Sequence, residues 1–445
     1  MSDFKISKEL DFSKSAVASP QYISVKVTPQ GGSTVSVSNT GTAQAIFELP
    51  TKPINFSKSY FQATMATDTA GGAGLTIICN LDAFPLLESM NLSTRSGTPI
   101  CNMSNIQQYL RIMNYRGQSY SEYKTRSEDD SLFYPSNATA NLTFDAVASN
   151  STTTAEENLH YTAGTANGIL TISNAKCMMS DFKDSIFAVD KNLMFPEICT
   201  LTLGFGGVSR QFIKSDSAAI SGTLTAYANG VNITAMELHL CIDANKSNEL
   251  AQAQQIDQKG YTVVVPYPIS NKQSFATSSA QNVGITLSSS SGRYLRKVVH
   301  SIFRTPTATD GGTIVATALN NSNKVASVTY GGLELTNYHT ELNSDRLQQY
   351  DLQCGLPCSD FADWKAKNKD TGPIFSRARF YYSWAHIDDW TNGRKGENEH
   401  VGIPINGQAK WDFVGTTTTT NTHDHYTFVI LGRELLIRKD GVAWI

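Results

Sequence analysis

The residues with the clearest potential for chemistry are two histidines that flank an aspartate, His423-Asp424-His425. Alternate side chains of a β-strand share a face, so the two imidazoles would point the same way, at a spacing that zinc sites use. His386 and Asp388, in "SWAHIDDW", are candidates to complete such a site. Nothing in the sequence brings the two segments together, and polar side chains beside aromatics are common at sheet edges. We therefore interpret these histidines as polar residues at a sheet edge, and predict no metal ligand and no cofactor.

The other chemical motifs are weaker. "GFGGVS" (204–209) resembles a glycine-rich phosphate loop but lacks the Lys-Ser/Thr that follows one, so we favour a bulge or turn. The acidic run "SEDD" (127–130) lacks EF-hand spacing and is typical of a solvated loop. Aromatic side chains alternate in "FYYSWAHIDDW" (380–390), which favours a strand facing a core over an exposed sugar-binding platform. With no catalytic or binding residue assigned, the sequence predicts a protein that is not an enzyme.

Composition and charge exclude several classes of protein. The chain has 445 residues, enough for two or three domains, and only 17% of them are charged. Its net charge of -3 argues against a basic face built for nucleic acid. "MSDFKISKELDFSKS" at the N-terminus lacks the apolar segment of a signal peptide, and no apolar run approaches the ~18–20 residues of a membrane span. We expect synthesis in the cytoplasm, no secretion, and reduced thiols at the seven cysteines.

Short alternating segments dominate the chain. In "YISVKV" (22–27), Ile23, Val25 and Val27 share one face of a strand. Similar runs separated by Pro, Gly and Asn cover residues 33–38, 45–49, 59–65 and 75–79. This rhythm predicts an all-β sandwich or barrel and not alternating strands and helices.

One stretch occurs twice. "QQYLRIMNYRGQSYSEYKTRSEDD" begins at Gln107, and "QQYDLQCGLPCSDFADWKAKNKDT" aligns with it without a gap from Gln348. Ser104-x-x-Gln107 reads as a capping box, and Asp345 takes the place of Ser104 in the second copy. The flanks agree, since "YISVKVTP" (22–29) resembles "YTVVVPYP" (261–268). We infer two similar halves, each with one short helix among its strands.

These patterns divide the chain into a polar tail (1–20), a first β unit (21–244), a polar helical linker (245–260) and a second β unit (261–445). The first unit closes with alternating apolar residues after an Asn-Gly turn, and the second closes with "YTFVILGRELLIRKDGV", an apolar run typical of a strand buried on both faces. Long Ser/Thr/Asn-rich segments inside each unit are interpreted as surface loops.

Four segments of the second half carry a family resemblance. They are "GRYLRKVVHSIFRT" (292–305), "YGGLELTNYHTELNSDRLQQYDL" (330–352), "RARFYYSWAHIDDW" (377–390) and "HDHYTFVILGRELLIRKDGV" (423–442). In order and spacing they resemble the double jelly-roll major capsid proteins of double-stranded DNA viruses, the lineage of adenovirus hexon and algal viruses, and most of all those of virophages and polinton-like viruses. In the first half the likeness is one of architecture. The resemblance implies two tandem eight-stranded jelly rolls, with a short helix in each and long polar loops.

The same resemblance implies a structural function. Three chains would form a homotrimer of pseudo-hexameric outline, a capsomer that tiles an icosahedral shell around a double-stranded DNA genome. The implied partners are neighbouring capsomers, penton and minor capsid proteins and, where one is present, an internal membrane, without sequence-specific binding of nucleic acid. The tail, with Phe4, Ile6, Leu10 and Phe12 among charges, is a candidate for the inner contact.

Two other functions stay open. A glycan- or receptor-binding attachment protein would carry exposed aromatics in its loops, whereas the long loops here are poor in Trp. A jelly-roll enzyme of the cupin or glycosidase type would need further ligands beside His423 and His425, and no Glu stands at close spacing.

Overall fold

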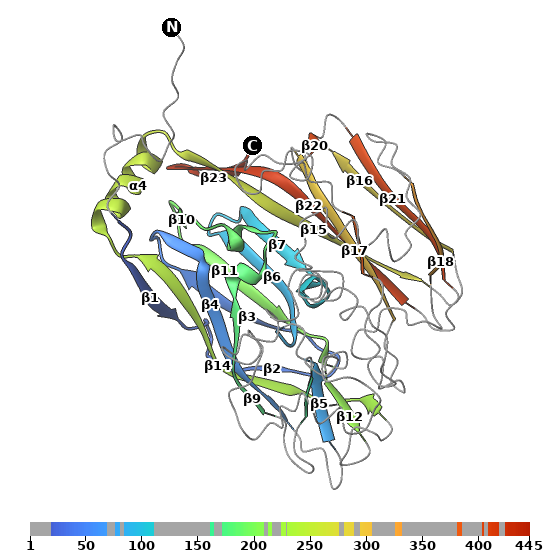
Figure 1. Ribbon diagram of the computed structural model, residues 1–445. Helices are drawn as coiled ribbons and strands as arrows, with labels where there is room; N and C mark the ends of the chain where they lie inside the picture. The colour runs from blue at the N-terminus through green and yellow to red at the C-terminus, as the bar shows by residue number, and fades with distance from the viewer. Residues whose placement is uncertain are drawn as a thin grey trace.

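A computed structural model shows that the regular elements of the described residues are mostly β-strands, with few helices (Figure 1). The structure describes residues 19–68, 76–80, 84–110, 161–163, 171–208, 212–215, 224–227, 229–275, 280–288, 294–304, 325–331, 381–384, 403–404, 408–417 and 423–445. The strands form five sheets, and within the described residues those before and after residue 250 pair in separate sheets. The all-β fold class predicted from the sequence is confirmed.

Two sheets form a sandwich in the first half. One has the order β1-β14-β4-β10, with β2 also pairing β14 and β9 also pairing β4, and the other has the order β3-β11-β6-β7. The strands of the first sheet are β1 (Tyr22–Val27), β2 (Val35–Val37), β4 (Ile54–Thr67), β9 (Thr171–Met178), β10 (Asn192–Leu193) and β14 (Val231–Asp243). Those of the second are β3 (Ala43–Leu49), β6 (Leu87–Thr94), β7 (Pro99–Ser104) and β11 (Cys199–Phe205).

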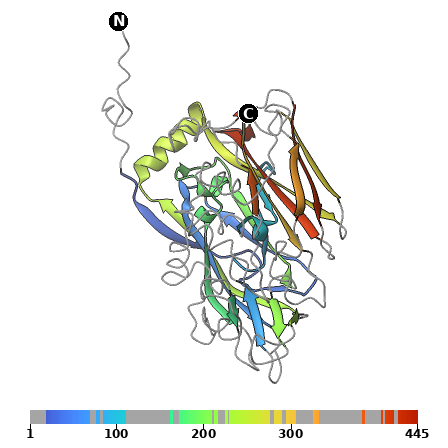
Figure 2. The ribbon, with the colours of Figure 1, turned by 45° about the vertical axis from the view of Figure 1, so that its right-hand side comes forward.

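The second half repeats this arrangement. One sheet has the order β15-β22-β17-β19, with β20 also pairing β17 and β23 pairing β22, and the other has the order β16-β21-β18. Its strands are β15 (Tyr261–Phe275), β16 (Ala280–Ser288), β17 (Tyr294–Arg304), β18 (Val325–Gly331), β19 (Tyr381–Trp384), β20 (Ile403–Pro404), β21 (Gln408–Thr417), β22 (His423–Arg438) and β23 (Gly441–Trp444). Figure 2 shows the two sandwiches side by side.

Strands of the two halves correspond in chain order and in sheet position. In the first half β1 pairs with the long strand β14, which also pairs with β4. In the second half β15 pairs with the long strand β22, which also pairs with β17. The corresponding pairs are β1 and β15, β3 and β16, β4 and β17, β6 and β18, β9 and β19, β10 and β20, β11 and β21, and β14 and β22. The sequence match between residues 22–29 and 261–268 therefore reflects a duplicated fold, because β1 and β15 begin at equivalent places.

A further small sheet is formed by segments that connect the strands of the first sandwich. It has the order β13-β12-β5-β8 and joins β5 (Thr76–Asn80), β8 (Tyr161–Ala163), β12 (Phe212–Ser215) and β13 (Leu224–Ala226). Figure 1 places β5 and β12 at the end of the first half that lies opposite α4. Segments from three separate connections therefore meet in one structure at this end.

Alternation of side chains builds the core between the sheets. Along β14, Met236, Leu238, Leu240 and Ile242 are all at most 5% exposed, as their period of two predicts. The bulge expected in "GFGGVS" is confirmed, because the register with β6 shifts between Gly204 and Phe205 at the end of β11.

Helix α4 (Lys246–Gln258) connects the halves, in the segment predicted to be helical. The Asn245 side chain caps it by accepting the backbone N–H of Ser247 at 3.0 Å. Gly260 then turns the chain into β15 with a φ of 70°. A Cβ at Gly260 would lie 2.6 Å from the carbonyl oxygen of Ile437, so both the conformation and the space favour glycine. Short 3-10 turns at Met179–Asp181 (η3) and Ile186–Ala188 (η4) follow β9.

The helix of the first repeated stretch begins differently from the prediction. Its helical residues start at Ile106, after Asn105 with a φ of 56°, and the Tyr109 N–H donates to the carbonyl of Asn105. Ser104 does not cap this helix; it is the last residue of β7, and its hydroxyl bonds to a residue of β15. The capping box was wrong because the strand continues to Ser104 and Asn105 makes the turn. The second copy, from Asp345, lies outside the described residues.

Candidate interaction surfaces

The two halves touch where the first helix begins. Tyr109 is fully buried, and its ring centroid lies 5.3 Å from that of Phe428 on β22, in an edge-to-face arrangement. Its phenol donates a hydrogen bond of 2.6 Å to the Asp184 carboxylate. Burial, with the nearby Asp184 charge, raises the pKa of Tyr109 well above its usual value, so the phenol stays a neutral donor.

Polar contacts surround this aromatic pair. The hydroxyls of Ser104 and Ser270 lie 2.5 Å apart, and the Asn105 amide donates to Ser270 Oγ at 3.3 Å. At the start of β7, the indole N–H of Trp444 donates to the Pro99 carbonyl at 2.8 Å. Strand β7 and the helix after it thus contact β15, β22 and β23 of the second half.

A second line of contact joins β15 to the β10 segment. The Tyr261 hydroxyl donates to the Met194 carbonyl at 2.9 Å and accepts the Met194 N–H at 3.1 Å. Burial raises the pKa of Tyr261 to about 12. Apolar residues of β15 and β22 beside it belong to the same hydrophobic cluster as the core of the first half, and they are Val263, Val265, Leu435 and Ile437, each at most 4% exposed. This face of the second half is therefore covered by the first half.

The equivalent face of the first half carries polar instead of apolar side chains. Tyr22 begins β1 and pairs with Asp243, and Tyr261 begins β15 and pairs with Ile437, so these positions are equivalent. Four residues further on, the pair Lys26–His239 in the first half therefore corresponds to the pair Val265–Arg433 in the second. We call the polar side chains of this face the first outer face. Its residues are Lys26 on β1, Tyr60 and Gln62 on β4, Lys176 on β9, and Glu237 and His239 on β14.

The first outer face is an ordered polar array. The His239 ring stacks on Tyr60 with centroids 4.6 Å apart and an interplanar angle of 7°. His239 Nε2 lies 3.1 Å from Glu237 Oε2, and the Gln62 amide donates to the same carboxylate oxygen at 3.2 Å. Lys26 forms an ion pair with Glu237, and its hydrogen bond and charge lower the pKa of Glu237. The Lys26 side chain nevertheless remains 52% exposed.

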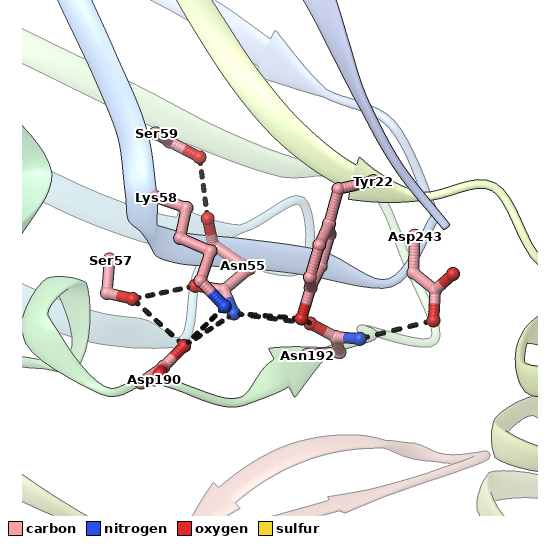
Figure 3. Close-up of polar contacts among 8 residues, drawn as sticks. All are labelled: Tyr22, Asn55, Ser57, Lys58, Ser59, Asp190, Asn192 and Asp243. Atoms are coloured by element: carbon pink, nitrogen blue, oxygen red, sulfur yellow. Dashed lines mark hydrogen bonds and ion pairs between the residues drawn. The ribbon is translucent and has the colours of Figure 1, made fainter. Parts of the chain in front are cut away.

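At its end near α4, the sheet that contains β1, β4 and β14 carries a network of polar side chains, some of them charged (Figure 3). The Tyr22 hydroxyl donates to Asn192 Oδ1 at 3.1 Å, and the Asn55 amide donates to Asp190 Oδ1 at 2.9 Å. Lys58 forms an ion pair of 3.2 Å with Asp190. The hydrogen bond from Asn55 and the charge of Lys58 lower the pKa of Asp190. This network joins β1, β4 and the β10 segment across the sheet.

Asp243 joins the same network to α4. Its Oδ1 accepts the backbone N–H groups of Gln21 and Asn245 at 2.9 and 3.0 Å. Its Oδ2 accepts the side-chain amides of Asn248 and Asn192 at 2.8 and 3.2 Å. Burial opposes ionisation of this carboxyl, but the four hydrogen bonds outweigh burial and lower its pKa.

The histidine pair singled out from the sequence is not at a sheet edge. β22 is a central strand, with His425 opposite Gln273 on one side and Ile302 on the other. Asp424 and His425 are 2% and 1% exposed, and Asp424 accepts the Ser274 hydroxyl at 2.6 Å and pairs with Lys272 at 3.2 Å. The edge interpretation was wrong because β22 pairs with both β15 and β17 as far as His423, so this end of the strand also has a neighbour on each side.

The remaining motifs are placed only in part. His386, Asp388 and the run 127–130 lie outside the described residues. The strand expected in 380–390 is present as β19, paired with β17. In the described part of the chain, no group of three or more His, Cys, Asp or Glu could hold a metal ion, and no helix is long and apolar enough to span a membrane. Cys101 and Cys199 are buried thiols whose pKa burial raises to about 12.

None of these contact residues could be identified individually from the sequence. The only usable signal was the repeat itself, because Gln107, Gln108 and Tyr109 open the first copy and all three are at most 5% exposed. A polar triplet that recurs and is buried indicates packing against another surface.

Comparison with known proteins gives structural relatives only. No protein-family model and no curated protein sequence matches the chain. The solved PBCV-1 virus capsid matches with a TM-score of 0.52 and 11% identity over 97% of this chain and 98% of that chain. The Sputnik virophage structure matches with a TM-score of 0.51 and 12% identity over 99% and 92% of the two chains.

The mavirus major capsid protein matches with a TM-score of 0.51 and 9% identity, over 100% of this chain and 95% of that chain. These similarities cover both halves at once, and at such low identity they establish the fold. The chain therefore has the double jelly-roll fold of these viral capsid proteins.

Proposed function

We propose that this protein is a major capsid protein whose homotrimers, pseudo-hexameric in outline, tile an icosahedral shell around a double-stranded DNA genome. The observation that carries the proposal is the duplicated sandwich, in which the first unit packs through β7 and Tyr109 onto a sheet face of the second. Three chains would then supply six similar wedges around a threefold axis. Such a ring packs hexagonally against its neighbours.

The structural relatives support this proposal. Three solved structures, named for a virus capsid, a virophage and a major capsid protein, match over at least 97% of this chain. A partial match would be expected if only one sandwich were shared. Coverage of both units in one alignment favours a common use of the pair.

The proposal includes the organisation of the chain and its partners. Residues 21–244 and 261–445 are the two jelly rolls, joined by a linker at 245–260, and the tail 1–20 makes the inner contact in the virion. Neighbouring capsomers, penton and minor capsid proteins are the partners, and the protein is made in the host cytoplasm. Its role is structural, without catalysis and without sequence-specific binding of nucleic acid.

The test is the mass of the purified protein in solution, measured by light scattering at several concentrations. We expect a species of three times the chain mass of 48.5 kDa that resists dilution, because obligate interfaces bury roughly 2,000–5,000 Å². A monomer at all concentrations would contradict the proposal. In that case glycan binding by the loops would be tested next.

A further inference from the structure

We propose that the β22–β23 hairpin is a clasp that locks the angle between the two units of one chain. The clasp comprises residues 433–445, and its two contact side chains are Arg433 and Trp444. This inference goes beyond the proposed function, because the clasp acts within a single chain and before any contact between chains. It gives a specific role to β23, which the described part of the first unit does not repeat.

The hairpin marks a point at which the two units differ. In the first unit β14 leads directly into α4, whereas in the second β22 turns back and continues as β23. The antiparallel pairing runs from Arg438 opposite Gly441 to Leu435 opposite Trp444. Gly441 has a φ of 130°, a conformation that favours glycine and allows the tight reversal. Figure 1 shows β23 at the same end of the molecule as α4.

The clasp is bonded both to the first unit and to the linker helix. The indole N–H of Trp444 donates to the Pro99 carbonyl at 2.8 Å, where β7 begins. At the turn, the backbone N–H of Lys439 donates to the Ile256 carbonyl of α4 at 3.1 Å, and its ammonium group lies 2.7 Å from the Asp257 carboxylate. That ion pair is exposed and contributes little, so the two hydrogen bonds to backbone carbonyls carry the attachment. The hairpin therefore joins two segments that are far apart in the sequence.

Arg433 fixes the Trp444 ring in the position that this contact needs. Its guanidinium carbon lies 4.3 Å from the ring centroid of Trp444 and 4.6 Å from that of Tyr267. The two rings meet edge to face, with centroids 5.4 Å apart and an interplanar angle of 78°. Among the described residues no carboxylate pairs with Arg433, and a half-buried guanidinium without a counterion is stabilised by the faces of aromatic rings. A ring held in this way loses little conformational entropy when its N–H meets the Pro99 carbonyl.

The clasp adds a third attachment to the two described above, at Tyr109 and at Tyr261. Its apolar side is part of the shared core, since Val442 is 7% exposed within the cluster and Trp444 packs against it. Two units joined by a linker move relative to one another unless the interface between them is extensive. An attachment from a separate strand restricts that rotation. In a pseudo-hexameric ring a fixed angle within each chain favours closure over open aggregates, a consequence that rests on the proposed function.

Hydrogen exchange at one amide tests whether the clasp restrains the units. The Met194 N–H donates to the Tyr261 hydroxyl across the halves, and neither residue belongs to the clasp. In the full-length protein, Trp444→Leu should speed exchange at Met194 at least tenfold, because the units separate more often, while exchange in the middle of β4 stays unchanged. Mass spectrometry with fragmentation measures both rates. Phe212→Leu is the matched control, because Phe212 is 1% exposed and its ring packs on Tyr227 within the first unit, so exchange at Met194 should not change.

A second variant keeps the test decisive if Trp444→Leu does not fold. Replacing Trp444 by 3-benzothienylalanine keeps the fused ring beside Arg433 and removes only the N–H that bonds to Pro99. Exchange at Met194 should then be at least threefold faster than in the wild type. Unchanged exchange at Met194 in either folded Trp444 variant, or an equal acceleration by Phe212→Leu, would overturn the clasp. Light scattering on the wild type tests the capsid proposal separately, since a monomer would contradict that proposal while the exchange rates still judge the clasp within each chain.

Discussion

The ring contact between Tyr109 and Phe428 should couple the two jelly rolls energetically. Both side chains are at most 1% exposed, and they meet edge to face at 5.3 Å. Phe428→Leu should destabilise the fold by about 1–3 kcal/mol, because it replaces a fully buried ring by a smaller side chain and leaves a small cavity. Tyr109→Leu should cost about 2–4 kcal/mol, because it also removes the phenol that bonds to the Asp184 carboxylate. The double variant should then lose about 0.5–1.5 kcal/mol less than the sum of the two single variants.

Urea unfolding at one fixed protein concentration measures these four free energies, with tryptophan fluorescence and far-UV circular dichroism as separate probes. The hydrogen bond to Asp184 is lost in both legs that change Tyr109, so it cancels from the coupling energy. Phe61→Leu combined with Phe428→Leu is the matched control, because the Phe61 ring packs on Phe84, and this pair should be additive within about 0.5 kcal/mol. A coupling below about 0.3 kcal/mol for Tyr109 and Phe428 would refute the contact between the halves.

Three further predictions concern buried polar groups. Because the pKa of Asp243 is lowered in the folded protein, its carboxylate stabilises the fold fully above the unfolded pKa of about 3.9, and this contribution is lost as pH falls through the folded pKa. Asp243→Asn should therefore lower the free energy of unfolding near pH 7 and flatten the acid limb of a stability–pH curve. An acid limb that stays unchanged in the variant would contradict this prediction. Tyr261→Phe should cost about 1–3 kcal/mol, because Met194 loses its partner across the halves, as a denaturation midpoint would show. Burial raises the pKa of Cys101 and Cys199 to about 12, so both thiols should resist iodoacetamide at pH 8 in the native protein. The half-buried Cys241 should react before these two in a mass-spectrometric time course, and equal rates for the three would argue against the burial of Cys101 and Cys199.

Local patterns predicted much of the fold. Alternation in residues 22–27 predicted that Ile23, Val25 and Val27 share one face, and Val25 and Val27 pack against the core from there, whereas Ile23 at the start of the strand remains 49% exposed. Turn and bulge chemistry at Gly204 and a polar helical pattern at 246–258 were also readable, because each depends on neighbours in the sequence. The repeated stretch and the matching flanks indicated a duplication, and the two sheet orders show it.

Contacts between distant segments were not readable in the same way. Ser104 was predicted to cap a helix and instead bonds to Ser270, which is 166 residues away. His425 was placed at a sheet edge and lies in a central strand, since periodicity does not reveal how many neighbours a strand has. Chain order alone does not say that Tyr109 reaches Phe428.

Local periodicity and turn residues establish which residues share a face, where strands turn, and that one unit is built twice. What covers each face depends on how distant segments pack. Val265 and Lys26 hold equivalent positions, yet the first is buried beneath the other half and the second faces outward. The period of a strand fixes the direction of its side chains, whereas burial depends on which distant surface arrives there. That difference between two copies of one fold is what gives the chain a covered face and an open one.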